Sequence, residues 1–152
     1  MLLMKMDACI DALLRLERQM LEALTPAPED IDGFLAGRAD VFAGWSQALC
    51  MSRKQDLLTA QAEGRNLFHE QKAHMRAHEE GRRAPAECPK PSMEQLWLVD
   101  WLCDALGGAA VCPFCGSPET GLYGELMTCS VQTLRLYASH VESCRKAAVA
   151  VG

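Results

Sequence analysis

Two pairs of potential metal ligands in the C-terminal part of the chain place the strongest constraint on its fold. Cys112 and Cys115 form a C-x2-C pair, and His140 and Cys144 form an H-x3-C pair. Zn²⁺ prefers four sulfur or nitrogen ligands in a tetrahedron, which two thiolates on a tight turn and two ligands one helical turn apart can supply. The spacing therefore predicts one structural zinc ion per chain, bound by Cys112, Cys115, His140 and Cys144.

Other interpretations of these residues remain open. Cys129 can compete with His140 for a place at the metal, because it lies between the two pairs. Cys112-Pro113-Phe114-Cys115 also resembles the active site of glutaredoxins, which implies a thiol-redox enzyme. Such a site opens a helix in a βαβ unit, whereas Gly116-Ser117-Pro118 follows here and disfavours a helix. The four residues can also be unconnected.

The segment from Leu136 to Cys144 resembles the L-x3-H-x3-C end of C2HC zinc fingers, and the resemblance is confined to residues 112–144. It implies a small zinc module ending in a helix. Compact fingers have roughly a dozen residues between their ligand pairs, but here residues 116–139 intervene. An added loop or hairpin is therefore expected, with a short strand over residues 122–127.

Composition narrows the class of protein and its compartment. The chain has 152 residues, of which 49% are hydrophobic, enough for one packed domain or two small ones. No export signal accompanies the eight cysteines, so we expect a cytoplasmic protein with metal-binding rather than disulfide-bonded cysteines. No apolar run is long enough to span a membrane. The net charge of −5 argues against nucleic acid as a partner.

Apolar residues at three-four spacing predict amphipathic helices in the first half of the chain. The first is expected over residues 3–24, and the second from Pro28 to Leu49. The third is expected as one long, partly exposed helix over residues 52–81. His74 and His78 are one turn apart on it, but without a nearby third ligand they are predicted to be exposed histidines rather than a second metal site.

Three prolines within residues 84–91 predict a linker, because proline cannot continue a helix. The predicted domains are a helical bundle region over residues 1–83 and a helix plus zinc module over residues 92–152. Ser92 is expected to cap a helix on which Trp97 and Trp101 share one face. This face is expected to pack in the core, and the alternative is an exposed patch that binds a partner. Thr128 or Ser130 is expected to cap the last helix.

The leucine-rich segment from Leu13 to Leu24, followed by Phe34-Leu35-Ala36-Gly37-Arg38, bears a weak resemblance to flagellar type III export chaperones. These chaperones are antiparallel helical proteins that hold export substrates in the cytoplasm. The resemblance covers residues 3–75 and implies a chaperone role for the helical part.

Taken as a whole, the sequence predicts a mainly α protein: an antiparallel helical hairpin or bundle followed by a small zinc-binding module with a terminal helix. The predicted function is that of a non-enzymatic zinc-binding adaptor, chaperone or regulatory protein. Its partner is expected to be another protein, and helical faces can also pair two copies of the chain. The alternative is a zinc-dependent or thiol-redox enzyme that uses Cys112 and Cys115.

Overall fold

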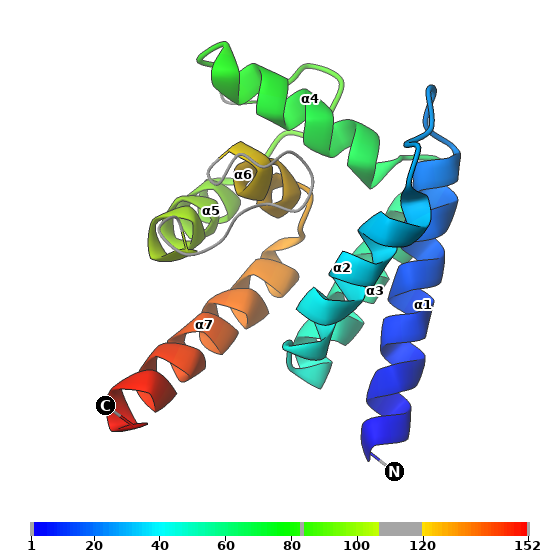
Figure 1. The fold of residues 1–152 in the computed structure, drawn as a ribbon. Coiled ribbons are helices and arrows are strands. Elements are labelled where there is room, and N and C mark those ends of the chain that lie inside the picture. The colour runs from blue at the N-terminus through cyan, green and yellow to red at the C-terminus, as the bar shows by residue number, and fades with distance from the viewer. Residues whose placement is uncertain (1, 83, 107–119, 152) are drawn as a thin grey trace.

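The computed structural model describes residues 2–82, 84–106 and 120–151, which form seven α-helices and no strands (Figure 1). This arrangement confirms the predicted mainly α fold. In this part of the chain, no helix combines the length and apolar character needed to cross a bilayer. The helices are α1 (Leu2–Glu22), α2 (Ile31–Ala43), α3 (Gln47–Ala62), α4 (Leu67–Glu79), α5 (Met93–Leu106), α6 (Thr120–Met127) and α7 (Val131–Val151).

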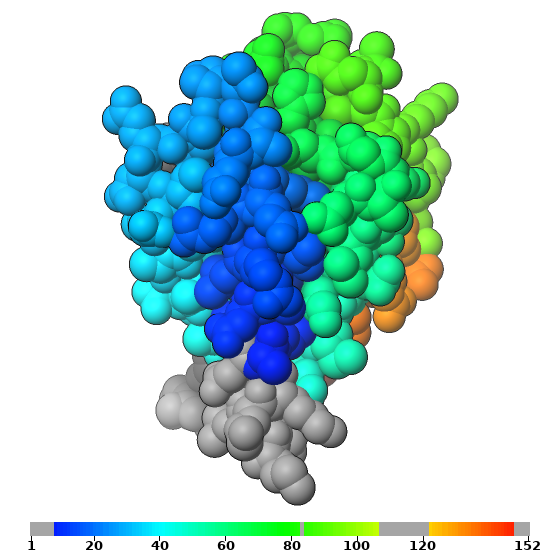
Figure 2. Space-filling view, turned by 90° about the vertical axis from the view of Figure 1, so that its right-hand side faces the viewer, coloured from blue at the N-terminus to red at the C-terminus, as the bar shows by residue number. Residues whose placement is uncertain are grey.

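Helices α1, α2 and α3 pack together around the first of two apolar cores. Leu13, Leu16 and Met20 of α1 face this core at helical spacing, as the three-four pattern predicts. Phe42 and Trp45 pack edge to face with ring centroids 5.0 Å apart. Burying an aromatic side chain of this kind stabilises a fold by about 1.5–3 kcal/mol. Figure 2 shows α1 on the surface, flanked by α2 and by the α3–α4 region.

Two breaks divide stretches that the sequence predicted as continuous helices. The predicted helix from Pro28 to Leu49 ends at Ala43, and Ser46 then caps α3 by accepting a hydrogen bond from a backbone N–H. The predicted helix over residues 52–81 is interrupted at Gly64, whose φ of +71° suits glycine. Asn66 caps the start of α4 in the same way as Ser46 caps α3. At both places a capping side chain starts a new helix, although the apolar pattern continues through the break.

Helices α5, α6 and α7 surround the second apolar core. The strand predicted over residues 122–127 is wrong, because these residues belong to α6. Leu122, Leu126 and Met127 all enter the core, whereas a strand would turn the adjacent Leu126 and Met127 to opposite faces. Ser130 caps α7 as predicted, since its Oγ accepts a hydrogen bond from Thr133 N at 3.2 Å.

Helix α4 approaches α6 closely at Gly124. A Cβ atom at this position would lie 2.6 Å from Met75 Cγ and 2.8 Å from the Gln71 carbonyl oxygen, both shorter than ordinary van der Waals contact. The Tyr123 ring lies next to that of His78, with centroids 4.4 Å apart. The contact brings together residues from before and after the predicted linker.

A buried ion cluster makes a second connection between the two ends of the chain. Arg38 in α2 donates two hydrogen bonds of 3.1 Å to the carboxylate of Glu17 in α1 and one of 2.7 Å to Glu125 in α6. Its guanidinium also lies 4.7 Å from the centre of the Phe42 ring. The Arg38 and Glu17 side chains are almost completely buried, so each charge depends on its partners for stabilisation.

The predicted linker, residues 84–91, lies between α4 and α5. Helices on its two sides touch, α4 against α6 and α3 against α7. Whether residues 1–83 and 92–152 fold separately stays a prediction.

Candidate functional site

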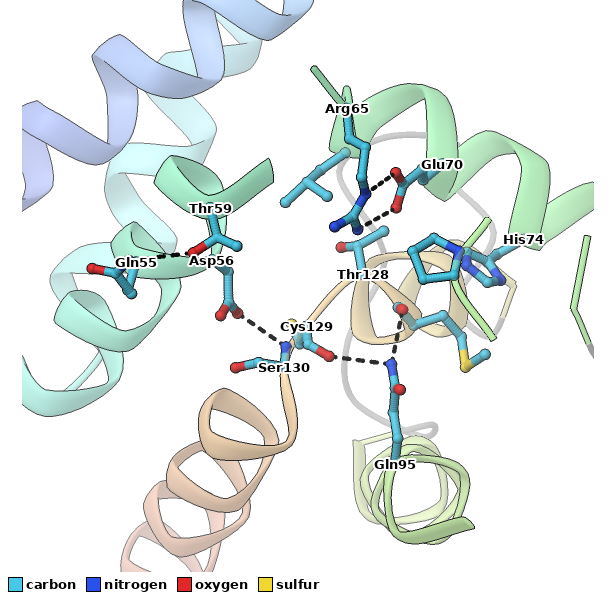
Figure 3. A pocket seen from close by; sticks show the side chains of 13 residues that line it. Gln55, Asp56, Thr59, Arg65, Glu70, His74, Gln95, Thr128, Cys129 and Ser130 are labelled. Carbon is cyan, nitrogen blue, oxygen red and sulfur yellow. Dashed lines mark hydrogen bonds and ion pairs between the residues drawn. The ribbon is translucent and has the colours of Figure 1, made fainter. Parts of the chain in front are cut away.

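A polar cavity lies where helices from the two parts of the chain meet (Figure 3). Its volume is about 390 Å³, which is within the range of small-molecule sites. The end of α3 and the start of α4 form one side, and the start of α5 with the α6–α7 turn forms the other. Most of the side chains that line it are polar: Gln55, Asp56, Thr59, Arg65, Glu70, His74, Gln95, Thr128 and Ser130.

Arg65 enters the cavity wall from the turn between α3 and α4. Its Nε and one terminal nitrogen donate to the two oxygens of Glu70 at 2.8 and 3.0 Å, and its other terminal nitrogen donates to Glu63. The hydrogen bonds to Glu70 hold the pKa of Arg65 above its ordinary value. Arg65 is thus a permanent cation whose hydrogen bonds go to two carboxylates of the same chain.

Asp56, near the end of α3, fastens the start of α7. Its Oδ2 accepts a hydrogen bond from Ser130 N at 3.1 Å and another from Thr133 Oγ1 at 2.7 Å. Arg53 Nη1 lies 3.7 Å from the same oxygen. The carboxylate therefore acts as a cap supplied by another helix, close to the positive end of the α7 dipole.

Gln95, in the first turn of α5, holds the other side of this turn. Its Nε2 donates to the carbonyl oxygens of Met127 at 3.0 Å and Cys129 at 3.2 Å. Arg53 adds hydrogen bonds to the Thr128 carbonyl at 3.1 Å and to Thr128 Oγ1 at 2.9 Å. Side chains from α3 and α5 therefore satisfy the carbonyl groups at the end of α6.

His74, on α4, lines the cavity but is only 2% exposed. The sequence-based expectation of an exposed histidine is wrong for His74, which lies with Ala77 on the buried face of α4, and is confirmed for His78. Burial lowers the pKa of His74, and nearby Glu70 opposes this effect, so the imidazole is neutral at pH 7. In the described chain, the buried side-chain atoms that lack a hydrogen-bond partner are His74 Nδ1 and Arg53 Nε. Both residues belong to the cavity wall or to the layer directly behind it.

Cys129 lines the cavity but is only 4% exposed, and its sulfur is engaged by neighbouring groups. Its thiol donates to the Glu125 carbonyl oxygen over 3.6 Å, and Arg53 donates to its sulfur over 3.5 Å. Burial raises the pKa of Cys129 to about 12. Since metals bind thiolates, this environment disfavours Cys129 as a ligand.

The predicted zinc ligands are described only in part. Cys112 and Cys115 lie outside the described residues. His140 and Cys144 lie one turn apart on α7, with Nε2 and Sγ separated by 3.8 Å. Among the residues that the structure describes, no group of three or more His, Cys, Asp or Glu side chains could hold a metal ion. The described pair alone therefore does not make a metal site.

Comparison with known proteins places most of these elements in one family. The family model described as a protein of unknown function (DUF4125) matches residues 8–98, which is more than half of the chain. The protein belongs to the DUF4125 family. The region shared with DUF4125 includes the cavity residues from Gln55 to Gln95 and ends inside α5. No curated protein and no solved structure matches the chain.

Membership in DUF4125 corrects both resemblances drawn from the sequence. The C2HC zinc-finger resemblance is wrong, because no finger family matches and the part of the fold that is described contains no metal-binding group. The export-chaperone resemblance over residues 3–75 is wrong as well, since these residues fall mostly within the DUF4125 match. Leucine-rich helical pairs share apolar spacing without common ancestry, which accounts for the second error.

Sequence reasoning missed the cavity because its polar side chains are separated by up to 75 positions, from Gln55 to Ser130. One signal was available. Asp56, Arg53 and Glu70 occupy helices whose apolar residues are sparse, and these charged residues are buried rather than exposed. A charge on the buried stripe of a helix indicates a partner from elsewhere in the chain.

Proposed function

We propose that this protein is a non-enzymatic adaptor or regulatory protein that acts by binding another protein through the exposed face of α5. The observation that supports the proposal is the exposure of two large apolar side chains one turn apart, Met93 at 79% and Trp97 at 65%. From the sequence, Trp97 was expected to pack in the core. Large apolar side chains at successive turns of a surface helix are typical of contact sites for another protein.

The groove beside Trp97 extends this surface towards α7. It has a volume of about 510 Å³, and Trp101 and Ala138 contribute apolar atoms to it. Helices pack through such grooves by inserting side chains at i, i+3 and i+4 positions. The shape therefore suits an amphipathic helix as the partner segment.

Charge selects the kind of helix that we expect. Asp100 and Asp104 are exposed on α5 beside Trp97, whereas the neighbouring Glu94 is paired with Arg135. One cation, Lys146, lines the groove from α7. Glu142 lines the groove as well and offsets this charge, so the two aspartates leave the surface acidic. The partner is therefore expected to be a basic amphipathic helix with apolar residues on one face.

Zinc remains part of the proposal as a structural ion rather than as a catalyst. His140 and Cys144 share a groove with Leu106, the last described residue of α5. Cys112 follows Leu106 by six positions, within reach of roughly 20 Å of chain. Three thiolates and one imidazole would leave no open position for substrate. A zinc or thiol-redox enzyme at Cys112 and Cys115 is the alternative.

The test uses a synthetic helix with leucines on one face and lysines on the other. Tryptophan fluorescence should shift to shorter wavelength as this peptide covers Trp97, with saturable binding. Trp97→Ala should abolish the binding, whereas Met51→Ala should retain it, because Met51 is also exposed, at 55%, but lies on α3.

Several outcomes would overturn the proposed surface. Equal binding by Trp97→Ala and the parent protein would exclude α5 as the contact. A preference for the glutamate analogue of the peptide would reverse the charge argument. A dimer in sedimentation analysis that Trp97→Ala converts to monomer would identify a second copy, rather than another protein, as the occupant.

A further inference from the structure

The cavity walls present hydrogen-bond acceptors that the fold leaves unused. The contacts of Asp56 with Ser130, Thr133 and Arg53 all involve Oδ2, so Oδ1 remains available. Gln95 makes its two hydrogen bonds through Nε2, which leaves Oε1 as an acceptor. Gln95 is hydrogen-bonded to Cys129 and Asp56 to the next residue, Ser130. Both side chains therefore lie at the same end of the cavity (Figure 3).

His74 closes the α4 side of the cavity without offering Nδ1 to an occupant. This nitrogen lacks a hydrogen-bond partner in the described chain, and its own surface is buried. The whole residue is only 2% exposed, so Nδ1 lies behind the cavity wall. The accessible acceptors are therefore those of Asp56 and Gln95.

The charge of the lining residues is negative. Asp56 and Glu70 contribute two carboxylates and Arg65 one guanidinium, which leaves one net negative charge. Two further charged residues pair with these groups, Arg53 with Asp56 and Glu63 with Arg65. Their charges are opposite, so they leave the net charge of the cavity unchanged. The cavity therefore favours a cation over an anion.

We propose that this cavity binds a small organic cation carrying a primary ammonium group, with Asp56 as its charged acceptor and Gln95 as a further acceptor. An ammonium group supplies three donors, of which two meet these acceptors from α3 and α5 and the third is left for water. The site is distinct from the α5 surface and adds a small-molecule ligand to the proposed protein contact.

The existing pairing of the cations makes an anionic ligand a poor fit. Arg65 donates to Glu70 through two nitrogens and to Glu63 through the third. Arg53 is buried and directs its terminal nitrogens to Thr128 and Cys129. The unpartnered Arg53 Nε has no surface open to the cavity. An anion would therefore have to break one of these charge-assisted hydrogen bonds, whereas an ammonium ion leaves them intact.

The first experiment follows amide signals of the full ¹⁵N-labelled chain by NMR during titration with 1,4-diaminobutane. We expect saturable shifts at the Ser130 backbone amide, at Thr59 and at the Gln95 side-chain amide. Succinate, of the same length but with two carboxylates, should leave these signals in place. Absence of saturation up to about 20 mM diamine, some twentyfold above a Kd of about 1 mM, would overturn the proposal, as would equal shifts with succinate.

Variants then separate this site from non-specific attraction to an acidic protein. Asp56→Asn should raise the Kd for the diamine by at least about tenfold, and Asp40→Asn, which removes an exposed acid of α2 outside the cavity, should leave it unchanged. Glu70→Gln removes the same charge from the α4 part of the cavity wall and should also weaken binding, so it decides the question if Asp56→Asn does not fold. Equal weakening by Asp40→Asn, or unchanged binding by folded Asp56→Asn and Glu70→Gln, would overturn the assignment.

Discussion

Arg38 in α2 donates a hydrogen bond of 2.7 Å to Glu125 in α6, although 87 positions separate them in the sequence. Glu17 in α1 completes the cluster through two further hydrogen bonds. Burial would by itself lower the pKa of Arg38, but the two carboxylates outweigh this effect and raise it. The guanidinium therefore stays charged and links three helices from both sides of the predicted linker.

Removal of this cation should strongly destabilise the fold. Arg38→Met leaves Glu17 and Glu125 buried without their partner, and breaking a buried pair in this way costs about 3–5 kcal/mol. Urea unfolding measures the loss. Arg18→Met is the matched control, because it removes an exposed pair with Asp32 and should destabilise the fold far less than Arg38→Met. Similar losses for both variants would contradict the structural importance of the cluster.

Alanine at Gly124 should separate α4 from α6. Its Cβ would meet both the Met75 side chain and the Gln71 backbone, and overpacking of this kind costs about 1–3 kcal/mol. Gly37→Ala provides the control, since nothing lies within 4 Å of a Cβ at that helical position. We expect the control to stabilise the protein by up to about 1 kcal/mol. Thermal or urea unfolding measures whether each variant is less or more stable than the parent protein.

His74 should make stability depend on pH in the mildly acidic range. Its folded pKa is depressed, so the unfolded chain, with an ordinary value of about 6.5, binds the proton first. Stability is then complete above the unfolded pKa and is lost as pH falls below it. Unfolding free energies at about pH 7.5 and about pH 5.5 measure the loss. His74→Gln should reduce it, and His69→Gln, at an exposed position, should not.

The zinc content of the purified protein tests the predicted metal site. Purified, reduced protein should contain about one zinc ion per chain by elemental analysis. Cys144→Ser removes a predicted ligand that is exposed on α7, so metal content should fall. Cys129→Ser should keep the metal, because this thiol is already engaged with Arg53. Zinc near zero in the parent protein would exclude the site.

The sequence was sufficient to predict the helices that local pattern determines. The helix predicted over residues 3–24 matches α1, since its apolar residues repeat at helical spacing and prolines end it. The mainly α class follows from the same periodicity. Breaks at Ser46 and Asn66 were missed because a cap needs only one polar residue in the right geometry, which the apolar pattern does not reveal.

The cavity could not be predicted because its geometry depends on packing between distant helices. Asp56 is an ordinary helical carboxylate until the turn before α7 brings Ser130 within 3.1 Å. Trp97 was predicted to be buried and is instead exposed. Its hydrophobicity predicted burial, but α5 turns Leu98, Val99 and Leu102 to the core instead. Which face of a short apolar helix is buried depends on its neighbours and not on its own sequence.

Helix α6 has only eight residues, two of them glycine, which is too short for stability in isolation. The carbonyl groups at its end are satisfied by Gln95 and Arg53, side chains that come from α5 and α3. The helix is therefore expected to form in the last steps of folding, after those two helices have docked. In stopped-flow measurements, Gln95→Leu should accelerate unfolding while leaving the folding rate nearly unchanged.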